Sequence, residues 1–362
     1  MMQDLMNKFV QNHELRNRGI TIIEEEQEKF VSYQAIYEKA LCYLKKFHDF
    51  GIHKGCEVLF QTENIEEFVY TFWACQMGCI TAVPVDIGEN AENIEKIFRI
   101  WKSLNNPFYL SQKYTFQLLS KHKDNYESEF GKIESRTLFY EDVTQNEIIE
   151  EFDINDHEHD YVSLIQYSSG STGTPKGIPI LYNSLSIHVN ALAKRECVTS
   201  SDKMLNWAPL SHNLGLVSVH IVGIFCAVNQ YLMSKQLFVR NPLLWMRKAS
   251  EHKITMIYAP NFGYKYLLTH YKATQNEKWD LSNIRIAFNG AEPINYKLCR
   301  EFVNTLKKYG LHDNVIYPAY GCSEATSVIS IPEVGRDIKV YYVDRRYLNI
   351  GKQIVLCEKS DK

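Results

Sequence analysis

The residues with the clearest chemical meaning form one short segment, residues 168–177. It reads Ser168-Ser169-Gly170-Ser171-Thr172-Gly173-Thr174-Pro175-Lys176-Gly177. Glycines let backbone N–H groups approach an anion with no Cβ in the way, and successive N–H groups form a concave anion-binding site. The hydroxyl side chains add neutral donors, and Lys176 adds a mobile positive charge. The segment therefore predicts a phosphate-binding loop, with a flexible surface hairpin as the alternative.

Two common nucleotide-binding patterns do not describe this loop. A Walker A loop has glycine before its lysine and serine or threonine after it, whereas here Pro175 precedes Lys176 and Gly177 follows it. The dinucleotide fingerprint needs the spacing G-x-G-x-x-G, which the glycines at 170, 173 and 177 do not have. The loop belongs to neither class.

Three later segments also combine turn residues with side chains that can do chemistry. In chain order they are Trp207-Ala208-Pro209-Leu210-Ser211-His212-Asn213-Leu214-Gly215, Asn289-Gly290-Ala291-Glu292-Pro293 and Tyr320-Gly321-Cys322-Ser323-Glu324. Taken alone, each has an ordinary structural interpretation. His212 could be a capping or core histidine, Pro293 could stand near a helix start, and Glu324 could be a solvated carboxylate.

The loop and these segments, in this order, resemble the signature of the adenylate-forming superfamily of acyl-CoA synthetases, peptide-synthetase adenylation domains and luciferases. The resemblance implies ATP and Mg²⁺ as cofactors, with Glu324 holding the metal; a carboxylate suits Mg²⁺, which prefers oxygen ligands. It implies catalytic roles for Lys176, His212, Ser323 and Glu324. The nucleotide-binding residues that it implies are Ser169, Gly170, Ser171, Thr172, Gly173, Thr174, Lys176, Gly290, Ala291, Glu292, Pro293, Tyr320, Gly321 and Ser323.

One branch of the superfamily matches best. Residues 258–264, Tyr258-Ala259-Pro260-Asn261-Phe262-Gly263-Tyr264, resemble a segment of fatty acyl-AMP ligases. This likeness implies that Asn261, Phe262 and Gly263, with His212, line the acyl side of the site. The tail from Val340 to Gly351 resembles the start of an insertion that in this branch disfavours coenzyme A. The resemblance implies a carboxylic acid as substrate, a fatty acid in this branch, and the phosphopantetheine thiol of an acyl carrier protein as acceptor.

The sequence departs from the superfamily pattern beside His212. Asn213 stands where an acidic residue is usual, and Ser211 stands where an aromatic residue is usual. Three alternatives stay open: an acyl-CoA synthetase core, an amino- or hydroxy-acid adenylation domain of a peptide or polyketide synthetase, and a non-catalytic nucleotide-binding scaffold. The absence of an acid at 213 makes an amino-acid substrate the less favoured of these.

The periodicity of apolar residues predicts an α/β fold with mostly parallel sheets flanked by helices. Residues 122–160 are charged and poorly patterned, so we expect surface structure around one strand there. Asn183 is expected to cap the helix that begins at that residue. Residues 214–228 are expected to form a buried helix. Expected helices cover 32–47, 65–77, 91–104, 114–121, 183–195, 245–252, 264–271 and 294–309. Expected strands cover 57–61, 80–85, 108–111, 137–140, 161–166, 177–181, 254–259 and 284–289.

The domain organisation follows from the resemblance. We expect an amino-terminal adenylate-forming core over 1–362, with two packed subdomains of roughly 1–170 and 171–335 and the start of the insertion at 336–362. The small carboxy-terminal lid of the superfamily, with its catalytic lysine, is expected to be missing. The isolated chain is therefore expected to be only weakly active.

Composition excludes several other classes. The formal net charge is −3, and no basic stripe points to nucleic acid. The nine cysteines contain no CxxC pair, which makes a zinc site improbable and suits a reducing compartment. The longest apolar stretch, 214–228, is too short to span a bilayer. A cytoplasmic location is expected.

Overall fold

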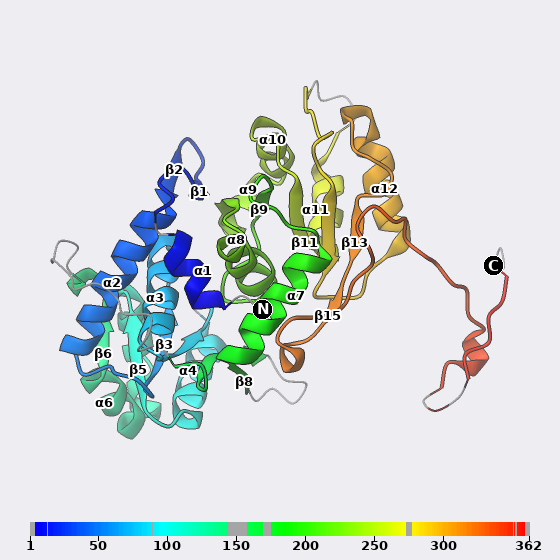
Figure 1. Cartoon of the computed structure of the whole chain (residues 1–362). Coiled ribbons are helices and arrows are strands. Elements are labelled where there is room, and N and C mark those ends of the chain that lie inside the picture. Colours follow the sequence, from blue (N-terminus) through cyan, green and yellow to red (C-terminus); the bar gives the residue numbers. More distant parts are fainter. Residues whose placement is uncertain are drawn as a thin grey trace.

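The computed structural model describes residues 4–12, 14–88, 90–143, 158–168, 175–272, 277–349, 351 and 353–358. Two large β-sheets form the scaffold of this part of the chain (Figure 1). The six-stranded sheet has the order β6-β5-β3-β4-β7-β8, and all neighbours are parallel except the β7–β8 hairpin. Its strands are β3 (Glu57–Gln61), β4 (Thr81–Pro84), β5 (Pro107–Ser111), β6 (Thr137–Phe139), β7 (Val162–Ser168) and β8 (Lys176–Leu181).

The seven-stranded sheet has the order β13-β12-β11-β9-β10-β1-β2 and is parallel except at the β1–β2 pair. Its strands are β1 (Gly19–Ile23), β2 (Glu28–Ser32), β9 (Lys203–Asn206), β10 (Asn229–Met233), β11 (Met256–Pro260), β12 (Ile286–Gly290) and β13 (Ile316–Pro318). A small antiparallel hairpin of β14 (Tyr320–Gly321) and β15 (Val328–Ser330) follows β13.

Helix ends follow local capping signals. The Ser32 hydroxyl accepts from the backbone N–H of Ala35 at the start of α2, and Gly51 takes the left-handed conformation (φ +86°) just after it. The α-helices are α1 (Leu5–Asn12), α2 (Tyr33–Asp49), α3 (Ile65–Met77), α4 (Ala91–Ser103), α5 (Lys113–Ser120), α6 (Glu127–Ser135), α7 (Tyr182–Arg195), α8 (Val222–Phe225), α9 (Lys235–Arg240), α10 (Leu243–Glu251), α11 (Asn261–His270) and α12 (Tyr296–Leu306). The shorter helical segments are η1 (Lys123–Asn125), η2 (Tyr140–Asp142), the π-helix η4 (Leu214–Ile221), η5 (Lys307–Tyr309), η6 (Ser323–Ala325) and η7 (Arg345–Tyr347).

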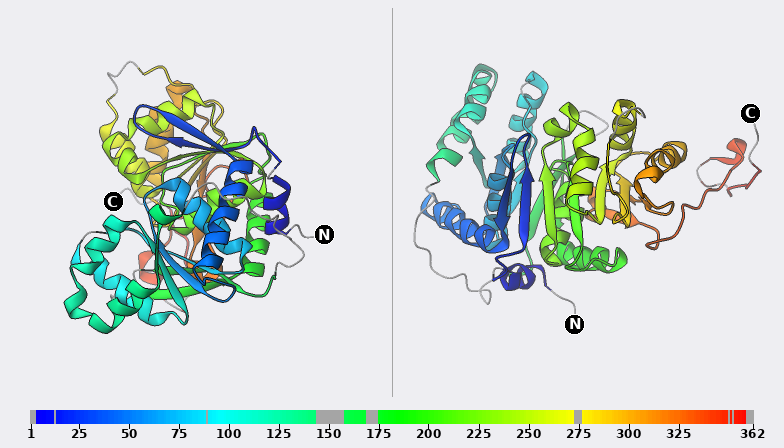
Figure 2. Two further views of the ribbon diagram at one scale, coloured as in Figure 1. Left: turned by 90° about the vertical axis from the view of Figure 1, so that its left-hand side faces the viewer. Right: turned by 90° about the horizontal axis from the view of Figure 1, so that it is seen from above.

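Helices flank the sheets (Figure 2), and the hydrophobic core fills the layers between these elements. The largest cluster includes Val58 and Phe60 of β3 together with Met256 and Tyr258 of β11, so it lies between the two sheets; α1, α2, α3, α7 and α8 contribute to it. The residue between Val58 and Phe60, Leu59, points to the other face, where α4 and α6 cover the six-stranded sheet. Strands buried on both faces explain the near-continuous apolar runs in the sequence.

The predicted α/β class with mostly parallel, helix-flanked sheets is confirmed. Two local expectations are wrong. The segment 122–160 is more than surface structure around one strand, because it contains α6, whose Phe130 and Ile133 are buried beneath α4. Asn183 does not cap its helix, because α7 begins one residue earlier and Leu181 occupies the cap position without a side-chain hydrogen bond.

The strands cross the expected subdomain boundary at residue 170. The β1–β2 hairpin comes early in the chain but lies in the seven-stranded sheet, where β1 pairs with β10. Conversely, β8 begins at Lys176 but completes the six-stranded sheet. The division of the chain into subdomains, with 336–362 as the start of an insertion, stays a prediction.

The longest apolar stretch forms the π-helix η4 and then α8, and all residues from Leu214 to Phe225 are buried. This confirms a buried helical segment, wound more loosely at its start than an α-helix. A search of the described residues finds no helix whose length and apolar character would let it cross a membrane.

A buried carboxyl group predicts how stability responds to pH. Glu196, directly after α7, is fully buried, and the Tyr258 hydroxyl lies 3.3 Å from its Oε2. Burial raises the pKa of Glu196 to about 8, although Tyr258 and Arg285 oppose the shift. The folded state therefore holds a proton that the unfolded state releases above its ordinary pKa of 4.5, and stability falls as pH rises from there through 8. We expect Glu196→Gln to remove this loss, so that between pH 5 and pH 9 the unfolding free energy of the variant should fall by about 4 kcal/mol less than that of the wild type.

Urea denaturation of both proteins at the two pH values measures this. A wild-type and a variant protein that lose the same stability between pH 5 and pH 9 would contradict the assignment.

Candidate functional site

The two ends of the phosphate-loop hairpin and Glu324 lie next to each other. Ser168 of β7 pairs with Lys176 of β8, so the loop closes a hairpin. Lys176 Nζ lies 4.0 Å from Glu324 Oε1, and their side chains are 70% and 56% exposed. The other predicted loop residues, Ser169, Gly170, Ser171, Thr172, Gly173 and Thr174, lie outside the described residues. The structure thus brings Lys176 and Glu324 together, although the sequence separates them widely.

The β14–β15 hairpin carries the second half of this arrangement. A Cβ atom on Gly321 would lie 1.9 Å from the carbonyl oxygen of Ser327, so the close approach of the two strands requires glycine. The backbone N–H of Val328 donates to His188 Nε2 on α7 at 3.2 Å. Burial lowers the pKa of His188, which keeps its ring a neutral acceptor. The hairpin therefore has a fixed position on the molecule.

A cavity of about 380 Å³ lies beside the hairpin. It draws on β7, β12, the start of η4 and the β14–β15 hairpin, at the carboxyl ends of parallel strands where α/β proteins bind ligands. Of the predicted site residues, His212, Ala291, Gly321 and Ser323 line it. The Asn213 amide donates to Ser323 Oγ at 3.0 Å and ties two of the segments together. The sequence interpretation missed Lys96, Gln166, Tyr167, Asn213, Leu214, Ser218, Phe288, Ala319, Cys322, Ser327 and Val328 in this lining.

The turn after β12 meets the cavity through its backbone. Ala291 has a φ of +69°, an uncommon conformation for a residue with a Cβ, of the kind that clusters at functional sites. The Ala319 N–H donates to the Asn289 carbonyl at 2.8 Å and places the turn beside the chain that leads to Tyr320. Glu292 accepts a hydrogen bond from the backbone N–H of Phe262, and Pro293 is exposed. Neither residue lines the cavity.

The predicted acyl-side residues 261–263 occupy a different place. They form the first turn of α11, where Asn261 Oδ1 accepts from the Asn295 N–H at 3.0 Å. Gly263 packs against Trp207 so closely that a Cβ would lie 2.4 Å from its Cζ2 atom. None of the three lines the 380 Å³ cavity. Tyr320 also lies outside its lining, with 67% of the residue exposed.

Asp86 is a charged residue that the sequence interpretation did not select. It follows β4, and its Oδ2 lies 3.1 Å from His212 Nε2, while the Ser211 hydroxyl donates to Oδ1. Burial raises the pKa of Asp86, but the hydrogen bond and charge of His212, with Ser211 and Lys96, lower it to about 2. Its position directly after the carboxyl end of an expected strand was the available signal.

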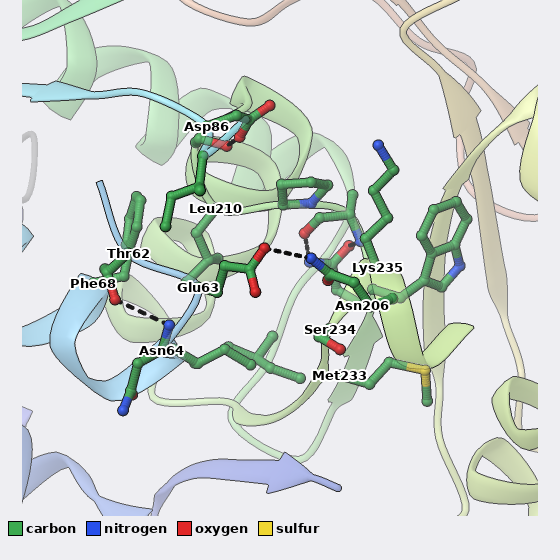
Figure 3. Close-up of a pocket in the computed structure, with 18 of the residues that line it drawn as sticks. Thr62, Glu63, Asn64, Phe68, Asp86, Asn206, Leu210, Met233, Ser234 and Lys235 are labelled. Carbon is green, nitrogen blue, oxygen red and sulfur yellow. Dashed lines mark hydrogen bonds between the residues drawn. The ribbon is translucent and has the colours of Figure 1, made fainter. Parts of the chain in front are cut away.

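A second cavity, of about 160 Å³, lies on the other side of the segment 207–211 (Figure 3). Phe68, Leu210 and Met233 supply apolar surface, and Glu63, Asn206 and Lys235 supply polar groups. Glu63 already has a hydrogen-bond partner, because its Oε1 accepts from Gln236 Nε2 at 2.7 Å. Asp86 lines this smaller cavity and contacts His212, which lines the larger one. The Asp86–His212 pair therefore lies between the two cavities.

A cluster of two carboxylates and a histidine, where β2 meets the end of α10, does not suit a metal. Glu28, Glu251 and His252 have ligand atoms within 4.8 Å of one another. Lys248 Nζ lies 2.8 Å from Glu28 and 2.7 Å from Glu251, so a cation is already present. We interpret the cluster as an ion-pair network between β2 and α10.

Comparison with known proteins places the chain in a family. The model of a family described as AMP-binding enzyme matches residues 10–358. The chain belongs to this family. Its relatives include fatty acyl-AMP ligases, acyl-carrier-protein ligases and adenylation domains, so the resemblance found in the motifs is confirmed at the level of the family.

Individual AMP-binding relatives are distant and longer. The medium-chain-fatty-acid–[acyl-carrier-protein] ligase JamA of Moorena producens is 25% identical over 335 residues, which are 92% of this chain and 56% of JamA. The long-chain-fatty-acid–AMP ligase FadD32 of Mycobacterium marinum is 32% identical over 196 residues, 52% of this chain and 30% of that protein. The chain therefore spans about half the length, or less, of these relatives.

Solved structures agree with the AMP-binding fold. McyG A-PCP complexed with phenylalanyl-adenylate superposes with a TM-score of 0.84 at 26% identity, covering 92% of this chain and 52% of that one. The fatty acyl-adenylate ligase from L. pneumophila has a TM-score of 0.85 at 22% identity, covering 98% of this chain and 61% of that one. This comparison shows that the two proteins share a fold.

Glycine 321 gives a direct test of the hairpin's role. In Gly321→Ala the new Cβ meets backbone atoms of Ser327 and Val328, so the hairpin must shift. We expect stability to fall by about 1–3 kcal/mol and ATP binding to weaken by about tenfold. Thermal denaturation and isothermal titration with ATP and Mg²⁺ measure the two effects.

Gly131→Ala is the matched control, because nothing lies within 4 Å of a Cβ built on this residue of α6. It should leave ATP binding unchanged and raise stability by about 0.5–1 kcal/mol. Equal behaviour of the two variants would show that the close contact at Gly321 does not matter.

Proposed function

We propose that this chain is the nucleotide- and acid-binding core of a ligase that activates a carboxylic acid, a fatty acid in our assignment, to an acyl-adenylate. A carboxylate oxygen attacks the α-phosphorus of ATP. The bond from that phosphorus to the oxygen bridging to the β-phosphate breaks, and its electron pair leaves with pyrophosphate. The observation that carries the proposal is the 4.0 Å approach of Lys176 to Glu324 beside a cavity lined by His212 and Ser323.

The residues of the chain act mainly by positioning and by charge. Lys176, at the end of the phosphate loop, is well exposed and can reach the β- and γ-phosphates. Ser323 lines the cavity and can hold the α-phosphate through its hydroxyl group, with Gly321 allowing close backbone approach. Tyr320 exposes 67% of its surface, which leaves its ring available to stack on adenine against the turn at 290–293.

The carboxylate of Glu324 fits a divalent cation. It is 56% exposed, and Lys176 is the partner found for it among the described residues, at a loose 4.0 Å. Mg²⁺ is usually held by one or two carboxylates together with substrate phosphates, and when bound it neutralises charge that develops on them. Glu324 supplies the one protein carboxylate that such a site needs.

The acid side of the site has two candidate walls. His212 faces the larger cavity and can meet the substrate carboxylate, while the smaller cavity in Figure 3 offers apolar surface from Phe68, Leu210 and Met233. This surface supports an acid with an apolar tail. Phe262 and Gly263 contact Trp207, which lines the smaller cavity, and Asn261 begins the same helical turn, so we assign the three residues a supporting role for that wall.

The acceptor in our proposal is the thiol of an acyl carrier protein. The support is JamA, a medium-chain-fatty-acid–[acyl-carrier-protein] ligase that is 25% identical to this chain. A chain that instead forms the coenzyme A thioester when both acceptors are offered would belong to the acyl-CoA synthetases. Mass spectrometry of the thioester products separates the two.

The decisive experiment for the activation step is ATP–pyrophosphate exchange with a mixed pool of carboxylic acids, followed by mass spectrometry of the acyl-adenylate. We expect fatty acids to support exchange and amino acids to support less. A protein that binds neither ATP with Mg²⁺ nor any adenylate would instead be a scaffold that retains the fold.

A further inference from the structure

The two cavities of the site meet at one pair of side chains, Asp86 and His212. Asp86 comes from the end of β4 in the six-stranded sheet, and His212 comes from the segment after β9 in the seven-stranded sheet. Asp86 Oδ2 lies 3.1 Å from His212 Nε2. Asp86 lines the smaller cavity, where Figure 3 labels it, and His212 lines the larger one. The pair therefore bridges the two halves of the molecule between both cavities.

The carboxylate of Asp86 is held from several sides. The Ser211 hydroxyl donates to Oδ1, and the amide of Gln166 donates to the backbone carbonyl of Ser211. Gln166 belongs to β7 and is only 4% exposed, so the segment that carries His212 is anchored to the core of the six-stranded sheet. Lys96 of α4, which lines the larger cavity, adds a positive charge near Asp86.

The groups around Asp86 keep its carboxylate ionised. Burial raises the pKa of Asp86, but His212, Ser211 and Lys96 together lower it to about 2, so the carboxylate is an anion at neutral pH. The other titratable groups on the lining of the larger cavity are Tyr167 and Cys322.

We propose that Asp86 is the positioning residue of His212 and holds its ring at the larger cavity, where the ring meets the carboxylate of the acid substrate. This inference rests on the proposed function. His212 has a side chain that is 59% exposed, and without a partner it would move between rotamers. A ring fixed at the cavity wall can meet the acid substrate in one orientation, and ATP binding falls to other residues.

A competing role for Asp86 is direct binding of an ammonium group on an amino-acid substrate, in place of the acid that Asn213 does not supply. The geometry favours positioning, because each carboxylate oxygen already has a partner in Ser211 or His212.

The test uses Asp86→Asn, which keeps the shape of the side chain and removes its charge. Exchange kinetics are measured for the wild type, Asp86→Asn and the exposed-site control Asp124→Asn. We expect Asp86→Asn to raise the KM for the acid by about tenfold and to leave the KM for ATP within about twofold. Asp124→Asn, in η1, should match the wild type.

A second measurement does not depend on activity. The ring signals of His212 are followed by NMR in the wild type and in Asp86→Asn, with His212→Asn to assign them. The proposal requires that the ring be held in one orientation in the wild type and be more mobile in the variant, so its order parameters should fall when Asp86 is changed. Equal order in both proteins overturns it, as does an equal rise of the acid and ATP KM values.

The outcomes also separate this inference from the proposed function. An Asp86-dependent order of the His212 ring without exchange on any acid would uphold the pairing and reject the activation of carboxylic acids. A variant that loses exchange with amine-bearing acids while retaining it with fatty acids would assign Asp86 to the ammonium and reject positioning.

Discussion

Glu324→Gln is expected to lower the rate of ATP–pyrophosphate exchange by about 10²- to 10³-fold, because it removes the carboxylate that holds Mg²⁺ beside the phosphates. The change retains the size of the side chain and its exposed position, so the fold should be intact. Lys176 Nζ lies 4.0 Å from Glu324 and would lose a loose, exposed ion-pair partner, which contributes little to stability. Exchange kinetics at several Mg²⁺ concentrations measure the effect.

The control for this variant is Glu301→Gln on α12, an exposed carboxylate that lines none of the cavities of the site. Its exchange rate should equal that of the wild type. If Glu324→Gln retained normal exchange with the same dependence on Mg²⁺, the metal-binding role of Glu324 would be wrong.

Arg285→Ala is expected to give the largest loss of stability, about 3–5 kcal/mol. Arg285 Nε and Nη2 lie 2.8 and 2.9 Å from the two carboxylate oxygens of Asp202, and Nη1 lies 2.9 Å from the carbonyl oxygen of Glu196. The Asp202 side chain is 7% exposed. Removing the guanidinium would leave a carboxylate buried without its cation, which is the costly case.

The position of this pair explains why the effect should reach the whole sheet. Arg285 and Asp202 directly precede β12 and β9, and Thr255, which donates to Asp202 Oδ1 at 2.7 Å, directly precedes β11. The three side chains therefore tie the amino ends of three parallel strands together. The opposite, carboxyl ends of β9 and β12 lead into the site.

Arg300→Ala is the matched control, because the Arg300 side chain has the same exposed fraction as Arg285, 29%, but pairs at 3.6 Å with Asp337, which is 67% exposed. The loss of stability in Arg300→Ala should stay below about 1 kcal/mol. Urea denaturation of the three proteins compares them, and equal midpoints for the two variants would contradict a special role for the buried pair.

Local patterns in the sequence determined much of this protein. Strand β3 and helix α3 have the expected bounds, because apolar alternation and helical spacing report the burial of a single element. The order of the motifs was enough to predict the family, since each motif is a short continuous segment whose residue types the chemistry restricts. The hairpin ends around the phosphate loop were also predictable, because an apolar strand runs directly into it and another leaves it.

Only the tertiary structure decided which segments meet. The pairing of β1 with β10, and the placement of β8 in the six-stranded sheet, depend on strand order, which no local pattern encodes. The same holds for the site: Asp86 reaches His212, and Lys176 reaches Glu324, because strands from distant parts of the chain end at the same edge. Residues 261–263 carry a family motif but pack against Trp207 outside the larger cavity. Sequence specifies the residue types a site can use, whereas distance and direction between them arise from the packing of whole sheets.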